Sequence, residues 1–160
     1  MKSLIIYSSR SGNTKKLAQA LNDRYGTKKS LISITDLPPM DGHYDWVAVG
    51  FPVMAGRVEP RAARFLSAFD CTTRKLFLFI THGSFRDAEL VKNVVKQAVS
   101  LVKNAEVSAV FTCQGEVDPR VLYKLKKGSA PPAWLDEADH AVGHPDSGDI
   151  EELIEAFNNL

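Results

Sequence analysis

The chain is short of both cysteine and long apolar segments. Its two thiols, Cys71 and Cys113, stand 42 positions apart and form neither a Cys-x-x-Cys motif nor a zinc-ribbon spacing. So few cysteines exclude a disulfide framework and favour a reducing compartment, and we therefore expect a cytoplasmic protein. The first apolar run, residues 4–7, is too short for a signal-peptide core or a membrane span.

An excess of charge of one sign is also lacking. Twenty Lys and Arg balance nineteen Asp and Glu, so the formal net charge is +1. This balance excludes the uniformly basic surface of a nucleic-acid-binding protein. The charge is nevertheless unevenly spread along the chain, because residues 1–80 carry a net +6 and residues 81–160 a net −5.

Short apolar runs alternate with stretches of helical periodicity along the chain. Strands are predicted at residues 4–7, 31–34, 45–51, 76–80 and 107–111. Helices are predicted at residues 17–25, 60–69, 90–102, 119–127 and 149–157. Asp149 and Glu152 resemble a capping box that opens the last helix. Residues 128–148, which contain three prolines, are expected to form an ordered surface excursion.

Strands that are nearly all apolar and that alternate with helices imply a parallel sheet covered on both faces. We therefore predict one α/β domain over residues 1–160, with a three-layer, doubly wound sheet of five parallel strands in the order 2-1-3-4-5. Ligands of such folds bind at the carboxyl ends of the strands. In this chain those ends follow Tyr7, Phe51 and Ile80.

The loop after the first predicted strand is rich in hydroxyl groups. Ser9, Ser11 and Thr14 surround a single glycine, Gly12, directly before the first helix. A helix N-terminus presents unpaired N–H groups and a partial positive charge, and a glycine lets an anion approach the backbone closely. This combination indicates a phosphate cradle. The alternative is a helix cap that binds no ligand.

Other phosphate-binding motifs do not fit. A P-loop requires two glycines followed by Lys and Ser or Thr, and a dinucleotide-binding loop requires three glycines, whereas this loop holds only Gly12. A receiver domain needs a carboxylate after the third strand, where the sequence reads Gly50-Phe51-Pro52. A cysteine phosphatase loop has one residue fewer than the six between Cys113 and Arg120.

The segment Ser9-x-Ser11-Gly12-x-Thr14 resembles the T-x-T-G-x-T phosphate loop of the flavodoxin family, with two threonines replaced by serine. The resemblance extends through the order of elements over nearly the whole chain. It is closest to the small bacterial flavodoxin-like proteins of the short-chain type, which lack a long insertion in strand five. A noncovalently bound FMN is implied, with its phosphate in this loop and its isoalloxazine ring against the loops after strands three and four.

The resemblance assigns cofactor-binding residues by position. For the phosphate they are Ser9, Arg10, Ser11, Gly12, Asn13 and Thr14, and for the ring they are Pro52, Val53, Met54, Ala55, Gly56, Thr81, His82, Gly83 and Phe85. Typical flavodoxins stack a Trp and a Tyr on the ring, but the matching loops here offer only Phe85 and His82. Gly56 permits the peptide rearrangement by which flavodoxins hydrogen-bond the reduced ring. Ordinary core packing is the alternative for Val53 and Met54.

Other conspicuous residues have structural interpretations. Trp46 is expected in the core, and Trp134 is either a lid over the site or an anchor for the excursion. The segment Cys113-Gln114-Gly115 either reaches the flavin or a partner, or forms a turn after a buried strand. His140 and His144 make an incomplete ligand set, so no metal site is expected.

The segments around the expected cofactor are basic. They contain Arg10, Lys15, Lys16, Arg57, Arg61 and Arg64. Positive charge there would favour the phosphate dianion and an anionic reduced flavin. It also predicts acidic redox partners and an association that weakens with salt. For Arg61 and Arg64 the alternative is a solvated face that points away from the cofactor.

Three functions fit these observations. The first is an FMN-binding electron carrier between a reductase and an acceptor protein, in which the flavin does the chemistry and no catalytic residue is required. The second is an FMN-dependent NAD(P)H oxidoreductase for a quinone or another small acceptor. The third is a flavin-free interaction module. Neither a nucleic acid nor a membrane is expected as a partner, and the sequence leaves the oligomeric state open.

Overall fold

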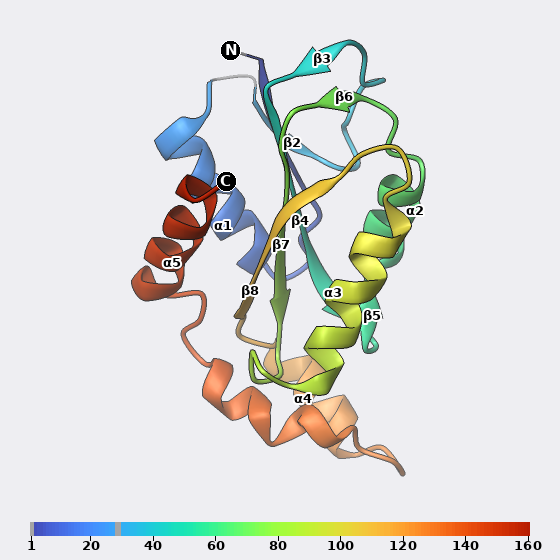
Figure 1. The fold of residues 1–160 in the computed structure, drawn as a ribbon. Coiled ribbons are helices and arrows are strands. Elements are labelled where there is room, and N and C mark those ends of the chain that lie inside the picture. The colour runs from blue at the N-terminus through green and yellow to red at the C-terminus, as the bar shows by residue number, and fades with distance from the viewer. Residues whose placement is uncertain (1, 28–29) are drawn as a thin grey trace.

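Five parallel strands form the central sheet of the computed structural model, which describes residues 2–27 and 30–160 (Figure 1). They lie in the order β2-β1-β4-β7-β8, which confirms the predicted doubly wound order. Their bounds are β1 (Ser3–Tyr7), β2 (Leu31–Ser33), β4 (Trp46–Met54), β7 (Leu76–His82) and β8 (Val107–Gln114). A small parallel sheet pairs β3 (His43–Tyr44) with β6 (Thr72–Thr73).

Helices cover both faces of this sheet and complete three layers (Figure 1). α1 (Asn13–Tyr25) and α5 (Ser147–Asn158) pack on one face, and α2 (Pro60–Ser67) and α3 (Glu89–Leu101) pack on the other. Trp46 is buried in the core between the sheet and α5, as predicted. No helix of the described residues has both the length and the apolar character needed to cross a membrane.

The side chains of β7 show why both faces are covered. Leu76, Leu78 and Ile80 lie in the core under α2 and α3, whereas Phe77 and Phe79 lie in the core under α1 and α5. All seven residues of the strand are buried. A continuous apolar run at the centre of a parallel sheet therefore supplies both cores with alternate side chains.

β4 is longer than predicted and ends in a hairpin. It continues through Pro52, Val53 and Met54, which the sequence analysis placed in a loop, and pairs antiparallel with β5 (Arg57–Val58). Ala55 and Gly56 form the two-residue connection with φ values of 48° and 72°. Positive φ at both positions is the geometry that joins tightly paired antiparallel strands.

The C-terminal part is ordered, as expected, but its helix begins earlier than predicted. α4 (Pro119–Lys126) is followed by two short 3₁₀ helices, η1 (Ala133–Leu135) and η2 (Glu137–Ala141). The capping box of α5 is formed by Asp146 and Asp149, not by Asp149 and Glu152. An aspartate at the third helical position reaches back to the cap N–H as a glutamate would, so the helix gains a further turn.

Candidate functional site

Three loops that follow β1, β4 and β7 lie together at the carboxyl edge of the sheet. The strand register places Tyr7 beside Gly50 and Phe51 beside Ile80, so β4 and β7 continue past the end of β1 at the same edge of the sheet. A buried hydrogen bond of 2.9 Å between the hydroxyls of Thr14 and Thr81 ties the start of α1 to the end of β7. The loops chosen from the sequence are therefore neighbours in space.

The loop between β1 and α1 has the geometry of an anion site. Gly12 has a φ of 99°, and no protein atom lies within 4 Å of the place that a Cβ would take. The Ser9 hydroxyl accepts hydrogen bonds from the backbone N–H groups of Gly12 at 3.2 Å and Lys15 at 3.3 Å, which folds the loop back over the helix end.

The first turn of α1 lacks an acidic residue, although the positive end of the helix dipole favours one. It contains Lys15 and Lys16 instead. Two cations at the positive end of a helix are electrostatically unfavourable unless an anion lies beside them. Together with the open space at Gly12, this charge arrangement fits a phosphate group.

Two residues predicted to bind the phosphate make contacts within the protein. Thr14 is buried and directs its hydroxyl to Thr81, and the Asn13 side chain donates a 2.8 Å hydrogen bond to the Glu116 carbonyl oxygen. Of the other hydroxyl groups assigned to the phosphate, that of Ser9 accepts from the loop backbone and keeps its own proton to donate, and that of Ser11 lies on an exposed residue.

Arg10 connects the loop between β1 and α1 with the segment after the hairpin. Its guanidinium is 3.6 Å from Oε1 of Glu59, whose side chain is fully buried directly after β5. The other carboxylate oxygen, Oε2, caps α2 by accepting a 2.9 Å hydrogen bond from the Ala62 N–H. Lys16 donates to the Pro145 carbonyl oxygen. Part of the positive charge expected at the cofactor is therefore paired with groups of the protein.

His82, at the end of β7, is a buried and neutral residue. Its Nδ1 lies 2.8 Å from the Ser84 carbonyl oxygen, so this nitrogen carries the proton and donates it. Burial is the main cause that lowers the pKa of His82 to about 4. The ring is thus enclosed within the loop, whereas the neighbouring Phe85 is 41% exposed.

The excursion after α4 packs directly on the loop that follows β7. Atoms of the Trp134 ring lie 3.3 Å from the position of a Cβ on Gly83, and the Phe85 N–H donates a 2.6 Å hydrogen bond to Glu137. The ring centroids of Phe85 and His140 are 5.1 Å apart. Of the two roles considered for Trp134, the packing on Gly83 fits an anchor.

This contact was missed from the sequence. Trp134, Glu137 and His140 lie in short 3₁₀ helices without hydrophobic periodicity, so no local pattern connects them with the loop after β7. The signal that was present was a tryptophan within a proline-containing excursion.

The other candidate groups have structural roles. Cys113 is fully buried, and burial raises the pKa of its thiol to about 12, so the thiol stays protonated. The Gln114 amide donates to the carbonyl oxygens of Gly83 at 3.3 Å and Glu137 at 3.4 Å. His144 lies 2.6 Å from Asp149, a carboxylate that already belongs to the α5 capping box.

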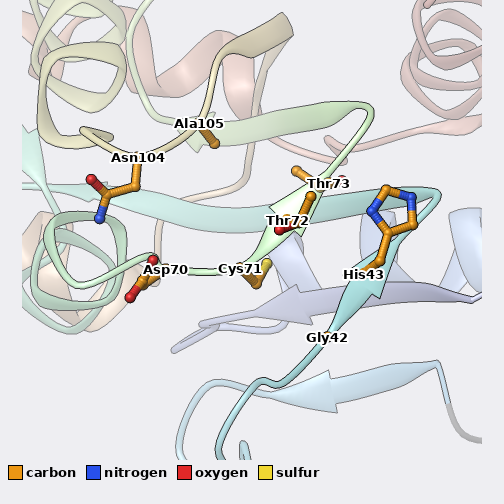
Figure 2. Close-up of a pocket in the computed structure, with 8 residues that line it drawn as sticks. All are labelled: Gly42, His43, Asp70, Cys71, Thr72, Thr73, Asn104 and Ala105. Carbon is orange, nitrogen blue, oxygen red and sulfur yellow. The ribbon is translucent and has the colours of Figure 1, made fainter.

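A separate hollow of about 520 Å³ lies at the opposite end of the sheet (Figure 2). Its lining residues are Gly42, His43, Asp70, Cys71, Thr72, Thr73, Asn104 and Ala105. These belong to β3, β6 and the segments beside them, at the amino-terminal ends of the strands. Burial raises the pKa of the Cys71 thiol, so this cysteine is not activated. The hollow contributes nothing to the carboxyl edge.

Comparison with known proteins gave a match to a family model. The model, described as a flavodoxin domain, matches residues 4–158. Among curated proteins, the flavodoxin-like domain-containing protein BilS of Clostridioides difficile (strain CD3) is 27% identical over 171 aligned positions, which cover 100% of this chain and 96% of that protein. BilS of Clostridium symbiosum (strain WAL-14163) is 25% identical, in an alignment that covers 94% of this chain and 90% of that protein.

Solved structures share the fold at lower identity. A flavoprotein from Lactobacillus acidophilus NCFM, solved in complex with FMN, is 19% identical, with a TM-score of 0.52 over 69% of this chain and 92% of that one. An azoreductase from Bacillus anthracis str. Sterne is 10% identical, with a TM-score of 0.58 over 100% of both chains. At these identities the likeness concerns the arrangement of the elements.

Proposed function

The chain belongs to the flavodoxin domain family, and from this premise we propose that it binds FMN noncovalently and carries electrons between redox partners. The observation that carries the proposal is the loop between β1 and α1. It combines the open backbone at Gly12 with a helix start that has two lysines and no acid. A phosphate dianion satisfies both features.

The structure suggests how this chain would hold the cofactor. The hydroxyls of Ser9 and Ser11 and the N–H groups at the start of α1 would bind the phosphate. The ring would lie between the β4–β5 hairpin and the loop after β7, near Phe85. Bound FMN supplies the redox chemistry, while the protein binds it, orients it and limits its access to water.

The ionisable groups at the ends of β7 and β8 are those expected of a protein in which the flavin does the chemistry. His82 is buried with a lowered pKa, and Cys113 is a buried, protonated thiol. Neither group is placed to give or take a proton at an exposed substrate. An electron carrier needs no such group.

The test is a titration of the purified protein with FMN and, separately, with riboflavin, which lacks the phosphate. We expect quenching of FMN fluorescence at one site per chain and binding of riboflavin at least tenfold weaker. The FMN-loaded protein is then mixed with NADH or NADPH, and slow oxidation is expected. Rapid oxidation would identify a reductase, and the absence of FMN binding would identify a flavin-free module.

A further inference from the structure

Exposed apolar side chains gather at the carboxyl edge of the sheet. Five large hydrophobic residues are exposed in the described part of the chain, and four of them are Phe85, Val121, Tyr123 and Val142. These four belong to the loop after β7, to α4 and to the segment before α5. Figure 1 places these elements together at the end of the sheet where β7 and β8 terminate.

α4 presents most of its surface to solvent. None of its eight described residues is buried. Leu122 and Leu125, three positions apart, are half-buried and form the face that packs on the protein. Tyr123 points the other way and is 61% exposed. Lys127 lies with its Nζ 4.2 Å from the centre of the Tyr123 ring and donates to the hydroxyl, which holds the ring in its outward position.

The charge of this helix is strongly positive. Between residues 117 and 134 the chain has four cations, Arg120, Lys124, Lys126 and Lys127, and one carboxylate, Asp118. Asp118 is paired with Arg120 at 2.7 Å. The three lysines are exposed, and the salt bridges of the described residues include none of them. They therefore form a basic surface in a C-terminal half that is otherwise acidic.

We propose that the exposed face of α4, formed by Arg120, Val121, Tyr123, Lys124, Lys126 and Lys127, is the docking surface for an acidic redox partner protein. The proposal rests on the proposed function, because an electron-transfer partner must approach the flavin at the carboxyl edge. Three lysines that form no salt bridge within the described residues complement carboxylates, and an exposed tyrosine beside an arginine is a common centre of protein interfaces.

The neighbouring acidic residues favour one orientation of a bound partner. Asp139 is exposed on η2 and Asp136 is exposed between η1 and η2, the two short helices that follow α4 in the chain. A partner carboxylate is attracted to the lysines of α4 and repelled by these aspartates. Such juxtaposition of opposite signs fixes the register of an association as well as its rate.

A membrane surface fits this helix less well than a protein. A helix that lies in a membrane interface buries a broad apolar face in the lipid. The apolar face of α4, formed by Leu122 and Leu125, is already turned to the protein. The outward side chains are mainly charged and are accompanied by a tyrosine and a valine, as at the rim and centre of a protein interface.

The test uses the FMN-loaded protein and an acidic plant-type [2Fe–2S] ferredoxin as the probe. Two reduced ferredoxins each lose one electron to the flavin, which gains both electrons and takes up protons from water. Reduced plant-type ferredoxin is a strong one-electron reductant, which makes it a suitable donor for this measurement. The rate of flavin bleaching is measured by stopped flow at about 10 mM and about 500 mM ionic strength, where the Debye length differs severalfold.

The decisive variant is K124E/K126E/K127E. Its matched control is R24E/R74E/K103E, which reverses three exposed cations near the amino-terminal ends of the strands and changes the net charge equally. We expect the α4 variant to slow the transfer at least tenfold at low salt, with most of the effect lost at high salt. The control variant should stay within about threefold of the wild type.

Equal slowing by the two variants, or no slowing by either, would overturn the docking surface. It would also be overturned if the α4 variant lost binding to phosphatidylglycerol vesicles but kept its ferredoxin rate. Failure of the proposed function is distinguishable, because the protein would then acquire no flavin absorbance. Circular dichroism of each variant verifies the fold. The variant Y123A tests the apolar contribution of the tyrosine to docking, and we expect it to slow electron transfer at high salt as well as at low salt.

Discussion

Gly12 and Gly42 both have a left-handed backbone conformation. Alanine substitutions at these two positions therefore allow the effect of backbone strain to be separated from the effect on ligand binding. Gly12, at the start of α1, has a φ of 99°, and Gly42, at the other end of the molecule, has a φ of 77°. Neither position has a protein atom within 3.4 Å of an added Cβ. Alanine at either site is therefore expected to cost about 1–2 kcal/mol of folding free energy through backbone strain alone.

Only the first substitution should affect the cofactor. We expect G12A to weaken FMN binding at least tenfold, because its methyl group occupies the space beside the helix start that the phosphate requires. G42A should leave the FMN dissociation constant unchanged. Fluorescence titration measures both constants, and chemical denaturation without FMN measures the stabilities. Equal dissociation constants for the two variants would contradict the placement of the phosphate.

His82 links the stability of the fold to pH. Its pKa falls from 6.5 to about 4 on folding, mainly through burial, so between these values the unfolded chain binds more protons than the folded one. The free energy of unfolding therefore contains a pH-dependent contribution from His82, which is fully present above pH 6.5. This contribution is lost as the pH falls toward 4, at about 1.4 kcal/mol per pH unit.

The variant H82N tests this dependence. Its amide nitrogen keeps a donor for the Ser84 carbonyl oxygen, but it has no group that titrates in this range. We expect a lower stability than the wild type at pH 7.5 and a flatter decline between pH 6.5 and pH 4, measured by urea denaturation at several pH values. Parallel curves for the two proteins would mean that His82 is not the source of the slope.

At the scale of elements, the hairpin after β4 illustrates what local sequence does not reveal. Pro52 and the glycines on either side of it suggested a loop, yet Pro52 lies within the strand. β1 ends at Tyr7, opposite Gly50, so beyond that residue β4 has a parallel neighbour on one side only. A proline is tolerated at such an edge. The end of β1 thus decided the structure of a segment more than forty residues away.

The excursion after α4 offers a prediction at this scale. We expect W134A to release the loop after β7, because the tryptophan ring packs on Gly83, at a cost of about 2 kcal/mol for a half-buried aromatic residue. Hydrogen exchange of the Phe85 amide, which is bonded to Glu137, should become faster. Y123A removes an exposed aromatic residue from α4 and should leave this exchange rate and the stability within about 0.5 kcal/mol of the wild type. Unchanged exchange in W134A would refute the anchoring role.

At the scale of the whole molecule, the two halves of the sequence stay side by side. The order of strands places β2, β1 and β4 on one side of the sheet and β7 and β8 on the other. Residues 1–80 carry a net charge of +6 and residues 81–160 a net −5, and the boundary between these halves falls within β7. The basic helix α4 is the exception, since it belongs to the acidic half and lies at its carboxyl edge.

Binding of FMN should stabilise the molecule as a whole. A ligand present at 100 times its dissociation constant adds about 2.7 kcal/mol, which corresponds to a rise in Tm of about 5–11 °C for a chain of this size. We expect this rise with FMN in differential scanning fluorimetry or calorimetry and a smaller rise with riboflavin at the same concentration. Equal shifts with the two flavins would show that the phosphate loop contributes nothing to binding.

The order of the elements, the topology of the sheet and the position of the loop where we propose that the phosphate binds could all be predicted from the sequence. These follow from hydrophobic periodicity, from turn residues and from a short motif at a strand end, all of which are local. The helix α5 was also predicted from a local pattern, its apolar face. Its N-terminal cap was predicted about one turn too late in the sequence.

How the loops at the carboxyl edge are held depends on contacts made in the folded chain. The tertiary structure paired Arg10 with the buried Glu59, enclosed His82 in a neutral form and brought Glu137 to the amide of Phe85, 52 positions away. It also left the lysines, Val121 and Tyr123 of α4 exposed to solvent while Leu122 and Leu125 face the protein. Such features depend on burial and on contacts between segments far apart in the chain, and neither quantity is encoded in a local pattern of residues.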